Sequence, residues 1–523
     1  MVWQRTQNKK QTRAHDTPRW RRVLVLGALL PGLVWAQAGL PALGDDGALT
    51  LGQEAQLGQR LYAQLWRRDA VLPDAWLADY LAQVWAPLWA AAQGLGLVAP
   101  EVAPRYHWRV LPIREASLNA FAMPGAVVGV HVGLVARSPS ADALASVLAH
   151  ELTHVTQRHI ARMLAQQQRN MPLWVAALLI GVAAAGSNTN AAQAAMAGAP
   201  ALAAQSGLNF GRDMEREADR LGQQVLGAAG YKPEALGQML ALLQQANRLN
   251  DDGSFAYLRS HPLGTERVAE AGARVAGLQA PGGWAGVSMP ALPSAAWHPW
   301  MQARAEVAIS DNPAQWQAWQ QQGERATAPL NEAAQVQAWR AALAAAKGQQ
   351  VAAAWGLLAE LAAVLPAGSA QADAVLGLQL RLWAQAPVRL PQVAQPQVQA
   401  MVQRALAGAR RALWLDATEA ALQVGMAREL VAVLRPWLSA HPADPLVWAA
   451  MARAQAALDL PLAALRAQAE LQWARGQGQQ ALERLDAAQR LLPKAAQREP
   501  HEADVVLARR AAMAQAWAQQ QAQ

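Results

Sequence analysis

Two histidines four residues apart, with a glutamate directly after the first, are the residues in this sequence best suited to chemistry. They are His150, Glu151 and His154, within the segment SVLAHELTHVTQRH that spans residues 146–159. Residues four apart share one face of an α-helix, so both imidazoles can bind one ion, and imidazole nitrogen is a favoured zinc ligand. Glu151 can then take a proton from a water that attacks a peptide carbonyl. The spacing predicts a zinc peptidase in which Glu151 is the general base.

An ordinary polar helix face is the alternative interpretation of the same three residues. The neighbouring side chains favour the metal site, because Val147, Leu148, Leu152 and Val155 indicate a buried helix. Unpaired histidines would be costly in such surroundings.

A hydrolytic zinc site needs three protein ligands, so one more must come from elsewhere in the chain. The best candidate lies about 60 residues further on, in the segment RDMEREADRLG at 212–222. Glu215 and Asp219 share a helix face there, so Glu215 could bind the metal while Asp219 accepts a hydrogen bond from a ligand histidine. Glu217 points about 200° away from Glu215 on the same helix. A solvated charged helix is the alternative for this segment.

The elements that must position these residues begin with a helical region and a small sheet. Leucines recur at helical spacing from Leu51 to Leu65, which predicts helix over about 50–95. Alternating and β-branched residues at 107–112 and 121–135 predict a few short strands. The expected fold class is mainly α, with helices and a small sheet around the site.

A long helix is expected to carry the two histidines. It begins at a cap formed by Ser140 or Asp142, runs through residue 164, and is followed by the next clear helix near residue 212. Between them, the insertion at 171–210 is apolar but shorter than a bilayer span. We expect it to form a core helix or a lid over the site, with a peripheral membrane contact as the alternative.

The length of 523 residues predicts two or more domains. From Gly277 to about residue 298 the sequence is rich in Pro, Gly and Ser, which marks a boundary. We therefore predict a peptidase domain at 39–280, a linker at 281–300 and a helical domain at 301–523.

The helical domain carries a degenerate repeat. A glycine, small and large apolar residues, and a closing proline recur with the spacing of the second half of a tetratricopeptide repeat, at Gly476, Ala481, Leu485, Ala488 and Pro493 and again from Gly425 to Pro442. Stacked helix pairs of this kind form a curved groove that suits extended polypeptide. An alanine-rich helical domain without repeats is the alternative.

The first 38 residues predict a cleaved signal peptide. Basic residues from Arg19 to Arg22 precede an apolar run of about 13 residues and the small-x-small site Ala36-Gln-Ala38. A bilayer span takes about 20 residues, so a retained anchor is the less favoured alternative. The mature protein would then lie outside the cytoplasm.

The charge and the absence of cysteine exclude several classes of function. The net charge is +8, but seven basic residues lie in the first 22 positions, and no motif of a nucleic-acid reader is present. We therefore expect no nucleic-acid partner. A chain with no cysteine has no disulfide framework, thiol nucleophile or thiolate metal site, so any metal must bind His, Asp or Glu.

The two charged motifs together resemble a known family. His150-Glu-Leu-Thr-His154, followed by Glu215-Arg-Glu-Ala-Asp219, resembles the gluzincin peptidases related to the prenyl-protein protease. The wider order is similar to the periplasmic branch of this family that acts in the assembly of outer-membrane β-barrel proteins. That order is a signal peptide, the strand Asn119-Ala-Phe-Ala122, the zinc helices, the segment Ser260-His261-Pro262 and C-terminal repeats.

The resemblance implies a zincin-type α+β domain with one zinc ion per chain. The ligands would be His150, His154 and Glu215, with Glu151 catalytic, Asp219 supporting a ligand histidine, and His261 as a regulatory fourth ligand that holds the enzyme inactive. The edge strand that pairs with substrate would consist of Asn119, Ala120, Phe121 and Ala122.

The resemblance also implies the location and the partners. These are the periplasm, misfolded or stalled outer-membrane β-barrel proteins as substrates, and the outer-membrane barrel-assembly machinery as the partner of the repeat domain. The rival interpretation is a repeat-based chaperone or scaffold for outer-membrane assembly, in which the metal site is latent.

Overall fold

The computed structural model describes residues 49–166, 206–249, 261, 265–277, 289–324 and 331–522. The predicted signal peptide and residues 171–205 of the predicted insertion lie outside the described residues. None of the helices within the described ranges combines the length and the hydropathy needed to cross a bilayer.

A three-stranded sheet lies beside the predicted site. It consists of β1 (Arg109–Ile113), β2 (Ala120–Met123) and β3 (Val127–His131), in the order β1-β3-β2. β1 is parallel to β3, whereas β2 is antiparallel to it and forms an edge of the sheet. Gly125, with φ of 71°, makes the turn between β2 and β3 in a left-handed conformation that favours glycine.

The predicted helix over 50–95 forms two helices, α1 (Leu51–Arg67) and α2 (Ala75–Gly94). Between them Asp69 has φ of 54°, and Asp74 caps α2 by accepting a hydrogen bond from Leu77 N. Asp74, which follows Pro73, is a residue typical of a helix start. The prediction of helix over 50–95 rested on leucine spacing and did not use this signal. The predicted strand region at 121–135 also ends early, because α3 (Val132–Arg137) follows β3 directly.

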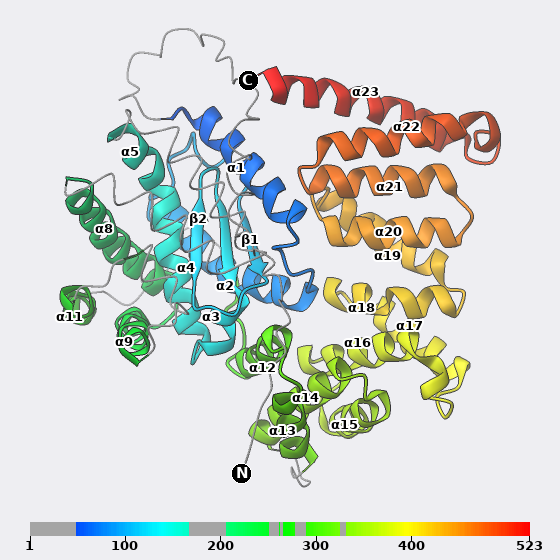
Figure 1. Cartoon of the computed structure of the whole chain (residues 1–523), viewed down its shortest axis with the longest axis horizontal. Coiled ribbons are helices and arrows are strands. Elements are labelled where there is room, and N and C mark those ends of the chain that lie inside the picture. The colour runs from blue at the N-terminus through cyan, green and yellow to red at the C-terminus, as the bar shows by residue number, and fades with distance from the viewer. Residues whose placement is uncertain are drawn as a thin grey trace, which may run out of the picture. The chain divides into compact units, whose positions relative to one another are not determined.

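The histidine helix is α4 (Ala141–Thr156), and its N-cap is Ser140, which accepts a hydrogen bond from Ala143 N. It does not continue through residue 164 as expected. Arg158 has φ of 51°, which is incompatible with a continuing α-helix, and α5 (His159–Gln166) follows as a separate helix. Figure 1 shows α4 lying alongside β2, with α8 (Ser206–Ala228) packed against it.

Two further helices complete the region around the site. They are α9 (Glu234–Leu249), which packs against α4, and α11 (Thr265–Arg274), which packs against α8 and α9 and ends in the short helix η4 (Val275–Gly277).

The remainder of the chain is a run of paired helices. These are α12 (Trp297–Ile309), α13 (Pro313–Glu324), α14 (Glu332–Lys347), α15 (Val351–Val364), α16 (Ala370–Gln385), η5 (Pro387–Arg389), α17 (Gln395–Ala407), α18 (Arg411–Gln423), α19 (Ala427–Ala440), α20 (Pro445–Ala457), α21 (Pro461–Ala474), α22 (Gly478–Ala495) and α23 (Pro500–Ala522). From α19 to α23 each helix packs on the next (Figure 1).

The predicted glycines and buried residues of the repeat take the expected places, whereas Pro493, the predicted closing proline, lies inside α22. Gly425 and Gly476 have φ of 79° and 71° in turns between helices, and Ala481, Leu485 and Ala488 are fully buried in α22. Small buried residues let neighbouring helices approach closely. The fold class is thus confirmed as mainly helical, with a small sheet followed by paired helices consistent with repeats.

The peptidase region and the helical run belong to one compact unit, residues 48–523. Tyr62 of α1 donates a hydrogen bond to the carbonyl of Ala474, and Arg411 of α18 pairs with Asp79 of α2. Helix α12 begins at Trp297, inside the range predicted as a linker. The domain limits themselves stay a prediction.

Candidate functional site

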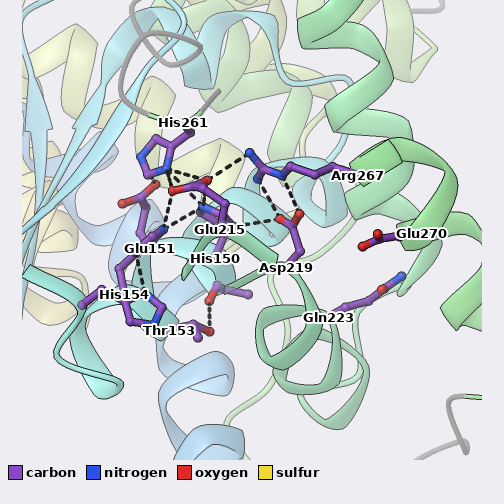
Figure 2. Close-up of polar contacts among 12 residues, drawn as sticks. His150, Glu151, Thr153, His154, Glu215, Asp219, Gln223, His261, Arg267 and Glu270 are labelled. Carbon is purple, nitrogen blue, oxygen red and sulfur yellow. Dashed lines mark hydrogen bonds and ion pairs between the residues drawn. The ribbon is translucent and has the colours of Figure 1, made fainter. Parts of the chain in front are cut away.

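Three histidines and a glutamate meet in the interior, between α4 and α8. The ligand atoms of His150, His154, Glu215 and His261 all lie within 4.8 Å of one another. The Nε2 atoms of His150 and His154 are 3.0 Å apart, and each lies 3.4 Å from an oxygen of Glu215 (Figure 2). Four side chains from three separate segments therefore place possible metal-ligand atoms around one point.

The helices bring these donors together through spacing and a close approach. His150 and His154 share the face of α4 that meets α8, where Glu215 lies. At Gly222 the two backbones come so close that a Cβ atom would lie 3.1 Å from both Ala149 O and His150 N. A glycine at this position allows α8 to place its carboxylates against α4.

Asp219 and Arg267 hold two of the possible metal ligands, His150 and Glu215, in position. Asp219 Oδ1 lies 3.0 Å from His150 Nδ1, and Arg267 donates from Nε to Oδ2 at 2.7 Å and from Nη2 to Oδ1 at 2.9 Å. Arg267 Nη1 also lies 3.0 Å from Glu215 Oε2 (Figure 2). One guanidinium thus holds both carboxylates, which suits its fork of donors.

Sequence reasoning assigned no role to Arg267. An arginine in a short charged helix has no distinguishing spacing, and its partners lie 48 and 52 positions earlier in the chain. Only the folded structure shows that Arg267 is buried, with 5% of its surface exposed.

Glu151 and His261 occupy the side of the cluster away from Asp219. Glu151 is 1% exposed, and its carboxylate lies beside the backbone of Ala122 in β2. His261 is wedged between two carboxylates, with Nδ1 2.9 Å from Glu215 Oε1 and Nε2 3.3 Å from Glu151 Oε1. The His261 ring therefore stands directly beside the predicted general base.

The electrostatics of the cluster favour positive charge. Burial alone would lower the pKa of His150, but its hydrogen bonds to Asp219 and Glu215 raise that pKa to about 10. Burial likewise opposes ionisation of Glu215, yet the neighbouring His261 and His150 hold its pKa well below the ordinary value. Burial raises the pKa of Glu151. Burial lowers the pKa of His154 well below the ordinary value, so this imidazole stays neutral, while the carboxylates stabilise a positive charge on His150 or on a bound metal ion.

These donors fit zinc. When the Nδ1 atom of each ring donates a hydrogen bond, as His150 does to Asp219, the two Nε2 lone pairs face each other at 3.0 Å, and a cation between them relieves their repulsion. The Nδ1 atom of His150 is already held by Asp219, which fixes Nε2 as the metal-facing nitrogen. Two imidazoles and one carboxylate are a donor set typical of hydrolytic zinc sites.

The strand residues predicted to bind substrate lie next to this cluster, not within it. Ala120, Phe121 and Ala122 belong to β2, which packs against α4, and Asn119 directly precedes the strand. The carbonyl of Asn119 accepts a hydrogen bond from His131 N, and its buried side-chain oxygen makes no hydrogen bond to the described residues. Among the described strands β2 pairs with β3 alone, and its packing against α4 places it beside the site.

Comparison with known proteins agrees with this geometry. Residues 87–275 match the model of Peptidase family M48. The chain is 34% identical over 252 residues to the beta-barrel assembly-enhancing protease of Escherichia coli strain K12, which covers 47% of this chain and 49% of that protein. The same protease of Yersinia pestis is 33% identical over 247 residues, with 47% and 49% covered.

A eukaryotic protein is also similar, at lower identity. The mitochondrial metalloendopeptidase OMA1 of Arabidopsis thaliana is 26% identical over 255 residues, which is 46% of this chain and 48% of that protein. In each of these alignments, the chain spans about half the length of the curated relative.

Proposed function

We propose that the chain is a zinc-dependent endopeptidase with Glu151 as general base, on the premise that residues 87–275 match the model of Peptidase family M48. The observation that carries the proposal is the meeting of His150, His154 and Glu215 beside a buried carboxylate. His150, His154 and Glu215 would hold one zinc ion, which supplies Lewis-acid activation of water and of the scissile carbonyl.

The other residues act on protons and on orientation. Glu151 takes a proton from the attacking water at a carboxylate oxygen, and its raised pKa suits passing that proton to the leaving nitrogen. Asp219 holds the His150 ring in one orientation through Nδ1. The edge of β2, from Ala120 to Ala122, would hold the substrate extended through backbone hydrogen bonds.

Substitution of Glu151 by Gln tests this mechanism. The variant is expected to bind zinc like the parent and to lose cleavage of an unfolded protein, because the amide cannot accept the proton. Glu266→Gln is the matched control, since this glutamate is 74% exposed on α11 and pairs with Arg216. Equal cleavage by the Glu151→Gln variant and the control would refute the role of Glu151.

We infer further that His261 keeps the site closed in this conformation. Its Nδ1 lies 3.3 Å from His150 Nε2, inside the donor group, and its Nε2 is beside Glu151. An imidazole in that place excludes the nucleophilic water and the substrate carbonyl. His261→Ala is expected to raise cleavage; an unchanged or lower rate with zinc bound would contradict the switch.

The substrate class follows from the relatives. Two of them are named as beta-barrel assembly-enhancing proteases, and we extend that role to this chain. The protein would work in the periplasm on misfolded or stalled outer-membrane β-barrel proteins, with the paired helices docking onto the barrel-assembly machinery. Capture of substrates in cells by the Glu151→Gln protein, followed by mass spectrometry, tests this extension; an absence of β-barrel proteins among them would refute it.

A repeat-based scaffold with a latent metal site is the second candidate, and the place of His261 within the group of possible metal ligands favours it. The two candidates differ in what Glu151→Gln does to a strain that lacks the protein. Full complementation by that variant, together with no rise in cleavage for His261→Ala, would support the scaffold over the peptidase.

A further inference from the structure

A second histidine–carboxylate pair lies behind the proposed zinc site, next to His154. His159 Nδ1 lies 2.9 Å from His154 Nδ1, and His159 Nε2 lies 3.1 Å from Glu217 Oε2. We propose that His159 and Glu217 are positioning residues for His154, as Asp219 is for His150. This inference rests on the proposed zinc site.

The pattern of hydrogen bonds gives each ring nitrogen one partner. His154 Nε2 faces His150 and Glu215, so its Nδ1 is the nitrogen that carries the proton. It donates to His159 Nδ1, which leaves His159 Nε2 as the donor to Glu217. We call this chain of hydrogen bonds, from His154 through His159 to Glu217, the relay. It fixes the tautomer of His154 in which Nε2 is free to bind a metal.

The turn after α4 is what brings His159 to this position. If α4 continued, His159 would lie five residues beyond His154 and about 140° around the helix, too far for the rings to meet. Arg158 adopts φ of 51° instead, a left-handed conformation that is unfavourable for a residue with a side chain. Its Nε donates to the buried carboxylate of Glu54 at 2.8 Å, which stabilises this turn.

The far end of the relay is anchored by α5 and α8. Arg162, one turn after His159 on α5, donates to Glu217 Oε2 at 2.9 Å. Helix α8 therefore supplies one ligand, Glu215, and two orienting carboxylates, with Asp219 directed at the first histidine of α4 and Glu217 at the second through His159. His159 itself is 2% exposed.

A purely structural role for His159 makes a different prediction. A buried histidine that only satisfies Glu217 would affect the stability of the protein without zinc, and it would leave zinc affinity unchanged. The two roles are therefore separated by measuring the zinc dissociation constant by chelator competition alongside the unfolding temperature of the zinc-free protein.

Two substitutions of His159 are chosen to differ at Nδ1. His159→Asn places an amide oxygen near the position of Nδ1 and keeps an acceptor for His154, whereas His159→Leu fills similar space with no acceptor. We expect Leu to weaken zinc binding about 10- to 100-fold and Asn to weaken it less than about 10-fold. Equal affinity of the Leu variant and the parent, or equal losses in both variants, would overturn the proposal.

Glu217→Ala tests the far end without disturbing a buried ring, and Arg216→Gln, its neighbour on α8, is the matched control. Arg216 pairs with Asp213 and Glu266, away from the metal group. Zinc affinity is expected to fall several-fold in Glu217→Ala and to stay unchanged in Arg216→Gln; no difference between them would also overturn the relay. If the parent protein binds no zinc, the proposed function itself is refuted. If the parent binds zinc and cleaves substrate, the comparison of variants tests the role of His159 and Glu217 alone.

Discussion

Replacement of Asp219 by Asn is the most direct test of how α8 supports the site. Asp219 is fully buried, and its two oxygens accept from His150 Nδ1 and from two nitrogens of Arg267. Asparagine keeps the volume and one acceptor oxygen. Its amide NH2 group must then face a donor of either His150 or Arg267, where no hydrogen bond can form.

The expected cost follows from these contacts. Removing one partner of a buried ion pair costs about 3–5 kcal/mol of unfolding free energy, because the other charge stays buried without compensation. Arg267 keeps its second carboxylate, Glu215, at 3.0 Å, so we expect the lower end, about 3 kcal/mol. Loss of the support behind His150 should also weaken zinc binding by about 10- to 100-fold.

Chemical denaturation of the zinc-free protein and chelator competition measure these two effects. Asp213→Asn is the matched control, because this aspartate lies on the same helix with a side chain 75% exposed and pairs with Arg216 at 3.6 Å. Such a surface pair contributes less than about 1 kcal/mol. If Asp219→Asn were as stable and bound zinc as tightly as Asp213→Asn, the support that we assign to Asp219 would be refuted.

Three further predictions concern packing and pH. Gly222→Val should push α8 away from the backbone at His150, with a loss of about 1–3 kcal/mol in denaturation and weaker zinc binding in chelator competition. Burial lowers the pKa of His131 to about 3, so between pH 7 and pH 5 the unfolded chain takes up a proton that the native state excludes. Stability should fall by about 2 kcal/mol over that range, and His131→Gln should reduce this loss in denaturation curves. Trp339→Ala should cost about 3–5 kcal/mol in urea unfolding, because the buried ring stacks on Trp300.

Much of the fold was predictable because its signals are local. The spacing of His150 and His154 on one helix face requires no knowledge of the rest of the chain, and the same holds for Glu215 and Asp219 on α8. The turn glycines of the paired helices are also local signals, since a positive φ favours glycine. These features therefore follow from the periodicity of the sequence.

The parts that were missed depend on contacts between distant segments. The break after α4 lies at Arg158, a residue that is no turn former, and its partner Glu54 is 104 positions earlier. The sequence places Glu217 about 200° away from Glu215 and assigns it no partner, yet His159 and Arg162 of α5 both contact it. Sequence periodicity cannot predict such a contact between α5 and α8, because the contact depends on the path of the chain between these helices.

The charges of the buried site give one reason why these distant contacts matter. Glu151, Glu215 and Asp219 are three buried carboxylates, and Arg267 neutralises one of them. A divalent cation bound by neutral histidines would balance the other two, which is the condition for burying charge at low cost. Without the metal, the carboxylates instead raise the pKa of His150 to about 10, so that a proton takes part of the cation's place. With Arg267 counted, the three carboxylates leave two negative charges when all of them are ionised, which a dication would balance and a monocation would not.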